Sequence, residues 1–157
     1  MSVDYRLEAA LPIPAREALA EVAKRLGGTG RLPDGGPGTQ GHGVTAWLVD
    51  ADGADREVVR GAFGFTPTIT IGFGPTTGDG WAGAVAAMVD AVFGLVLREG
   101  VIAVLLAGGE DVVLAIRDGR VLLSADREEW DLPQVRVVVT ATVRVPYDRR
   151  ALPSPLL

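Results

Sequence analysis

The sequence predicts a single α+β domain, covering residues 1–157, in which a mainly antiparallel sheet buries one face under two helices. A chain of 157 residues has the length of one domain. Most of the expected strands are joined by short turns, which favours antiparallel pairing. Only two segments have clear helical periodicity. The composition is 48% hydrophobic, so the chain has ample material for one core.

The first quarter of the chain is expected to form a strand, a helix and a loop. Residues 3–9 alternate between apolar and charged side chains, which is the period of a half-buried strand. Pro14 then precedes an apolar stripe at helical spacing in residues 15–26, and glycines follow as a stop signal. Residues 27–43 contain eight glycines and two prolines, which predicts a flexible loop.

The next strands are expected in residues 44–50, 57–65 and 66–73. The dipeptide Asp52-Gly53 lies between the first two and is typical of a tight hairpin turn. Residues 80–98 have the length and periodicity of the second helix, with a broad apolar face.

The last third of the chain is expected to be a meander followed by one long strand. Residues 101–106, 112–116 and 121–123 read as strands, and Asp118-Gly119 predicts a two-residue turn before the last of them. Valines at every second position predict a long strand in residues 135–145, and residues 147–157 are expected to be a frayed tail.

Composition and charge exclude several classes of function. The chain has no cysteine and one histidine, His42, so most metal and thiol chemistry is excluded. Its net charge of −5 argues against nucleic-acid binding and favours a basic partner. The N-terminus lacks the pattern of a secretory signal, so we expect a cytoplasmic protein. Asp90 interrupts the apolar residues 81–97, which favours a buried helix over a membrane span.

Three motifs resemble cofactor or metal sites but lack the required context. Residues 36–41 match G-x-G-x-x-G, yet they follow a helix and precede a strand, the reverse of a dinucleotide site. The same glycines fail as a P-loop because His42 replaces the lysine. A calcium loop begun at Asp50 would hold Asp55 and Gly61 where glycine and glutamate are needed. We therefore expect no catalytic residue, cofactor or metal.

The segment 126–131 is the strongest candidate for a partner-binding surface. It places acidic residues and one arginine around a tryptophan, and aromatic anchors are enriched in protein interfaces. The alternative is that Trp130 caps the edge of the core while its neighbours are solvated. The candidate residues, including a second acidic turn, are Glu110, Asp111, Asp126, Glu128, Glu129, Trp130 and Asp131.

The chain resembles the Sit-type immunity proteins of bacterial polymorphic toxin systems. The resemblance is carried by residues 3–7, by the strand 68–71 leading into the helix around Met88, and by residues 109–114 continuing through Arg117-Asp118-Gly119 to Glu129-Trp130. It extends over most of the chain to about Asp131. It implies a cytoplasmic protein that neutralises a cognate toxin by binding it.

Two classes of function follow from the sequence. The first is a protein that binds and neutralises a toxin, which the acidic charge predicts to be basic, without catalysis. The second is a small-molecule-binding domain or an enzyme with a cleft near the glycine-rich loop. A strand at residues 135–145 would also favour a weak homodimer if it lies at a sheet edge, although Arg136 and Arg144 argue against pairing there.

Overall fold

The centre of the protein is one sheet whose middle strand is the first in the chain. The computed structural model describes residues 3–28, 32 and 36–152. Within these residues the sheet has eight strands in the order β2-β3-β4-β1-β5-β6-β7-β8, antiparallel except for the β7–β8 pair. The strands are β1 (Tyr5–Ala10), β2 (Gly38–Gly41), β3 (Val44–Leu48), β4 (Ile69–Pro75), β5 (Ile102–Ala107), β6 (Asp111–Arg117), β7 (Arg120–Ser124) and β8 (Tyr147–Arg150).

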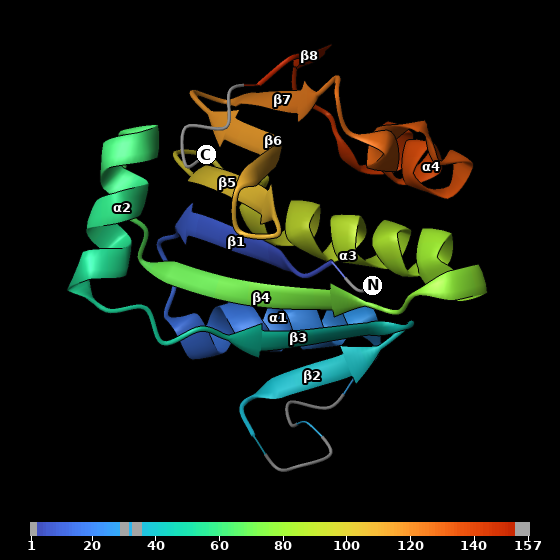
Figure 1. Ribbon diagram of the computed structural model, residues 1–157, viewed down its shortest axis with the longest axis horizontal. Coiled ribbons are helices and arrows are strands. Elements are labelled where there is room, and N and C mark those ends of the chain that lie inside the picture. The colour runs from blue at the N-terminus through green and yellow to red at the C-terminus, as the bar shows by residue number, and fades with distance from the viewer. Residues whose placement is uncertain (1–2, 29–31, 33–35, 153–157) are drawn as a thin grey trace.

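Three helices cover one face of this sheet and a fourth lies on the other face. The helices α1 (Ala15–Leu26), α3 (Trp81–Val96) and α4 (Pro133–Thr142) pack beside one another and share the main core with the inward side chains of the strands. Helix α2 (Gly53–Phe63) contributes to a smaller core with the opposite face of β5 and β6 (Figure 1). The α+β class is confirmed, but the expected pair of helices on one face is a layer of three.

The predicted meander and its covering helix are confirmed. Strands β5, β6 and β7 pair in sequence, and Leu105 and Leu106 flank a register shift in the first pair. Leu105 also lies opposite Leu7 of β1. Helix α3 is buried along most of its length. Among the described residues, Gly78–Val96 is the one helical stretch long and apolar enough to cross a bilayer, and more than half of it is buried inside the protein. Packing in the core accounts for its apolar composition.

The strand predicted for residues 57–65 is wrong, because most of this segment belongs to α2. Asp52 is the N-cap of this helix: its side chain accepts a hydrogen bond from Asp55 N at 2.9 Å, and the Asp55 side chain accepts one from Asp52 N at 3.4 Å. This capping box satisfies amide groups that a new helix leaves unpaired. Val58 is 55% exposed, so helix α2 buries little apolar surface. The aspartate read as a hairpin turn is instead a helix start.

The strand predicted for residues 135–145 is also wrong, because most of it forms α4. Pro133 occupies the first turn, where its missing N–H is tolerated. Valines at every second position also place one at every fourth position, so the same run fits a helix. Val135 and Val139 are buried on this stripe, whereas Val137 is 68% exposed. The homodimer argument required residues 135–145 to be a strand at a sheet edge. Because most of this segment is helical, that argument no longer applies.

Parts of the predicted loop and tail are ordered as strands. Gly38–Gly41 forms β2, an edge strand of the sheet paired with β3. A Cβ atom on Gly41 would lie 2.0 Å from the carbonyl oxygen of Leu26, so glycine is required where β2 passes the end of α1. Strand β8 lies in the predicted tail and pairs in parallel with β7. Residues 29–31 and 33–35 of the loop and 153–157 of the tail lie outside the described residues.

Candidate partner-binding surface

Trp130 is a core residue. Its side chain is 3% exposed, and its indole Nε1 donates a hydrogen bond to Val113 O at 3.0 Å. Its ring centroid lies 6.4 Å from that of Phe93 on α3, with the two planes 31° apart. An interface anchor must be accessible to its partner, so the structure favours the alternative in which Trp130 packs at the edge of the core.

Glu129 is buried as well and is held by two groups. Its side chain is 1% exposed. The Tyr5 hydroxyl donates to Glu129 Oε2 at 2.7 Å, and Arg127 donates from Nε to Oε1 at 3.1 Å and from Nη2 to Oε2 at 2.8 Å. Burial raises the pKa of Tyr5, and the neighbouring Glu129 carboxylate raises it further. The pKa of Arg127 is raised by its hydrogen bonds to Glu129. This network ties β1 to the 3-10 turn at Glu128–Asp131.

The remaining acidic candidates lie at the surface. Arg127 also forms an ion pair with Asp111, with 3.6 Å between Nη1 and Oδ2, and so links the β5–β6 turn to segment 126–131. Arg149 of β8 donates to Asp131 at 2.7 Å, a hydrogen bond that lowers the pKa of Asp131. The other three candidates are exposed and make no salt bridge with another described residue; they are Glu110, Asp126 and Glu128.

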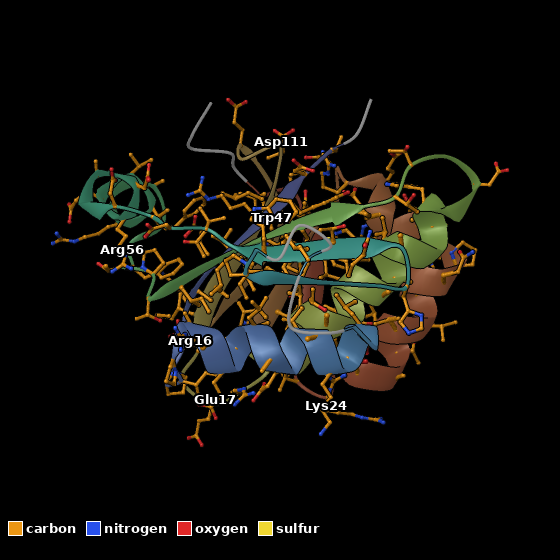
Figure 2. All side chains as sticks on the ribbon, turned by 90° about the horizontal axis from the view of Figure 1, so that it is seen from below. Arg16, Glu17, Lys24, Trp47, Arg56 and Asp111 are labelled. Atoms are coloured by element: carbon orange, nitrogen blue, oxygen red, sulfur yellow. The ribbon has the colours of Figure 1, made fainter. Side chains whose placement is uncertain are left out.

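Within the described residues, no helix covers the outer face of β3 and β4, which points away from α1 and α3, whereas α2 lies beside Glu8 on the same face of β1 (Figure 1). We call the outer face of β3 and β4 the open face. Trp47 of β3 lies on it, and Figure 2 shows Trp47 and Asp111 on the side of the sheet opposite α1. A Cβ atom on Gly72 would lie 2.3 Å from Trp47 Cε2, so the indole rests directly on the β4 backbone. Glycine at position 72 is therefore what lets the tryptophan lie flat across the sheet.

A hollow of about 480 Å³ opens beside Trp47. Asp4 and Arg6 line it from the N-terminal strand, and Gly108 and Gly109 line it from the β5–β6 turn. Gly108 N donates to Asp4 O at 2.8 Å, which holds this turn against the start of β1. The predicted acidic residues Glu110 and Asp111 follow the two glycines in sequence, so this half of the predicted surface adjoins the open face.

A protein-family model described as SitI3-like matches residues 3–134. The chain belongs to the SitI3-like family. The match begins before β1 and ends just inside α4, so it includes the open face, the hollow beside Trp47 and segment 126–131. This membership agrees with the resemblance to Sit-type immunity proteins. No curated protein sequence and no solved structure matches the chain.

Trp47 is the residue of this SitI3-like protein that the sequence interpretation missed. The signal was present in two neighbouring strands. Trp47 alternates with inward apolar residues along β3, and Gly72 and Gly74 alternate with Ile71 and Phe73 along β4. A large aromatic residue beside a strand that lacks side chains on the same face indicates a shallow binding surface.

Two smaller hollows lie near the open face of the SitI3-like domain. One, of about 120 Å³, is lined by Glu8, Asp55 and neighbours between β1 and α2. The other, of about 320 Å³, lies at the end of β3 and is lined by Pro37, Asp50, Arg56 and mainly apolar neighbours. Pro37 belongs to the glycine-rich segment. This second hollow is therefore the one that corresponds to the alternative hypothesis, a small-molecule site near that segment.

Glu8 is a buried acid on the outer face of β1, beside α2. Its side chain is 2% exposed, and it accepts hydrogen bonds from Arg6 Nε at 2.7 Å and from the Thr70 hydroxyl at 2.7 Å. Burial raises the pKa of Glu8 above its ordinary value of 4.5, although Thr70 and Arg6 act in the opposite direction. Glu8 therefore holds Arg6 in place at the price of a desolvated carboxylate.

We expect Glu8→Gln to change how the stability of the SitI3-like domain depends on pH. Because the folded pKa is raised, the contribution of Glu8 to stability is fully present below about 4.5, the unfolded value, and is lost as pH rises through the folded value. Glutamine does not ionise, and its amide keeps an acceptor for Arg6 and gains a donor for the Thr70 hydroxyl oxygen. The free energy of unfolding of the variant should therefore rise relative to wild type between pH 4 and neutrality.

Urea unfolding at several pH values measures this difference directly. Glu17→Gln on the exposed side of α1 is the matched control and should leave the pH profile unchanged. If wild type gained stability over Glu8→Gln as pH rose, the assigned direction of the Glu8 pKa would be wrong.

Proposed function

We propose that this protein is an immunity protein that binds and neutralises a cognate protein toxin without catalysis. The observation that carries the proposal is the SitI3-like match over residues 3–134, which covers the described strands except β8 and the described helices except most of α4. The net charge of −5 supports a basic toxin as the partner, because complementary charge speeds association. The absence of cysteine from the sequence suits a cytoplasmic site of action.

We place the toxin interface on the open face and on the adjoining turn at Glu110 and Asp111. The opposite face of the sheet is occupied by α1, α3 and α4, so its strands are unavailable to a partner. On the open side, Trp47 offers a partly exposed aromatic surface. Two exposed acids are close to it: Asp4 lines the hollow, and Glu110 follows the glycines at the edge of the hollow in sequence. Aromatic residues surrounded by charge are typical of protein interfaces. Asp126 and Glu128 form a second exposed acidic group, and Arg127 between them is joined to Asp111 by an ion pair.

Co-expression with a candidate toxin, chosen from the genes next to the one that encodes this protein, tests the proposal. Cells that produce the toxin should grow when this protein is also produced, and an affinity tag on the toxin should retrieve a complex of the two. Glu17→Gln on α1 is the control, because Figure 2 shows Glu17 on the far side of the molecule; it should protect as wild type does. Protection without a complex, or with a covalently altered toxin, would favour an enzymatic function instead.

A further inference from the structure

The geometry points to a cationic side chain, an arginine or a lysine of the partner, as the group that enters the hollow beside Trp47. We call this hollow, with Asp4, Trp47, Gly72 and Gly74, the cation pocket. The inference rests on the proposed function for the identity of the partner as a toxin. It deepens that function by naming the contact through which the toxin is recognised.

The floor of the cation pocket is the β4 backbone, with the Trp47 indole lying on it at Gly72. Neither Gly72 nor Gly74 has a side chain, and both lie on the open face of β4. A point one Cβ bond above Gly74 lies 3.4 Å from Asp4 Oδ1, 3.5 Å from Trp47 Cζ3 and 3.6 Å from Trp47 Cη2. The Asp4 carboxylate and the six-membered ring of Trp47 therefore lie on either side of Gly74, close enough for one bound group to contact both.

This pair of groups is suited to a cation. An aromatic face attracts a guanidinium or ammonium group through its quadrupole, and tryptophan is the most effective of the aromatic side chains. A carboxylate adds a charge-assisted hydrogen bond, which for arginine has the geometry of a fork. A planar guanidinium stacked on the indole would thus place an N–H donor toward Asp4.

The negative charge of Asp4 is not paired with any basic side chain among the described residues. Asp4 is exposed and forms no salt bridge with another described residue. The one basic residue that lines the hollow, Arg6, is already held by Glu8 at 2.7 Å. A further acid, Glu110, follows the glycine rim in sequence and is exposed. An anion would be repelled here, and an apolar side chain would desolvate Asp4 without replacing its hydrogen bonds to water.

A titration with a small arginine probe tests the pocket without the toxin. N-acetyl-arginine amide is added to ¹⁵N-labelled protein, and N-acetyl-citrulline amide, which has nearly the same shape and no charge, is the matched probe. We expect saturable chemical-shift changes at the Trp47 indole N–H and at the Gly72 and Gly74 amides with arginine only. Asp4→Asn should weaken this binding by about fivefold or more, whereas Glu17→Gln should leave it unchanged. No saturable change, equal changes with both probes, or indifference to Asp4→Asn would each overturn the inference.

A second arm uses the toxin and separates this inference from the proposed function. Asp4→Asn and Trp47→Ala should each weaken toxin binding by about tenfold, while Glu17→Gln binds as wild type does. Asp4 is exposed, so Asp4→Asn remains informative if Trp47→Ala is poorly folded. If wild type binds and neutralises the toxin while Asp4→Asn binds equally well, the cation pocket is wrong and the function stands. If wild type does not bind the toxin, the proposed function fails and the arginine titration alone decides on the pocket.

Discussion

Replacing Trp130 by alanine is expected to lower the free energy of unfolding by about 3–5 kcal/mol. The side chain is 3% exposed and packs against Phe93 of α3, so its removal leaves a cavity between the sheet and the helix layer. Its indole also donates the hydrogen bond to Val113 O, a carbonyl that would lose this donor inside the core. Because both packing and a hydrogen bond are lost, we expect this substitution to cause one of the largest decreases in the free energy of unfolding of any single change in the chain.

Urea unfolding of Trp130→Ala and Trp47→Ala provides the matched comparison, since the same side chain is removed from the core and from the open face. We expect a much smaller loss at Trp47, which is only partly buried. Trp130→Phe should recover part of the packing but not the hydrogen bond, and should fall between wild type and Trp130→Ala. Equal losses at the two tryptophans would contradict the placement of Trp130 in the core. Any effect of Trp130→Ala on toxin binding is then expected to follow from its effect on folding.

Glu129→Ala is expected to destabilise the protein by about 3–5 kcal/mol, because it breaks a buried ion pair and leaves its partners unsatisfied. The substitution removes the acceptor for the Tyr5 hydroxyl and for both donating nitrogens of Arg127. Tyr5→Phe removes one of these hydrogen bonds and should lower stability by about 1.5–3 kcal/mol, the usual range for a hydrogen bond to a charged group.

The neighbouring residue Glu128 is the control for this network. It is exposed and makes no salt bridge with another described residue, so Glu128→Ala should change stability by no more than about 0.5 kcal/mol. Once Glu129 is alanine, Tyr5→Phe should lose most of its effect, because the two residues share one hydrogen bond. Fully additive losses in the double variant would show that the network does not act as a unit.

The parts of the fold that the sequence predicted are those in which local pattern and burial agree. Apolar spacing placed α1 and α3 close to their observed bounds, and Asp118-Gly119 fixed the β6–β7 turn. The strands predicted at residues 57–65 and 135–145 are wrong because the Asp52-Gly53 dipeptide also fits a helix start and the alternating valines also fit a helical stripe. At residues 57–65 a capping box decided for a helix, and at residues 135–145 the contact of α4 with α3 did. The contact between α3 and α4 joins segments far apart in the sequence, so no local pattern could have revealed it.

The burial of the candidate surface residues could be predicted less well than the fold, for a similar reason. Segment 126–131 has the composition of an exposed acidic patch, but the burial of Glu129 is determined by Tyr5, which lies 124 positions earlier in the chain. Trp130 is buried by Phe93 on another element. The position of Glu110 and Asp111 outside the core could be predicted because turn residues remain at the surface. The open face was missed because its main feature is the absence of side chains at Gly72 and Gly74.

The most direct test of neutralisation by binding is a titration of purified toxin activity with purified protein. If the protein acts as a stoichiometric inhibitor, activity falls linearly with added protein and reaches its minimum near one equivalent when both are well above the dissociation constant. Dissociation of the complex should then return an active toxin and an unmodified inhibitor. Complete loss of activity at a small fraction of one equivalent, increasing with time of incubation, would show catalytic inactivation and would contradict the proposed function.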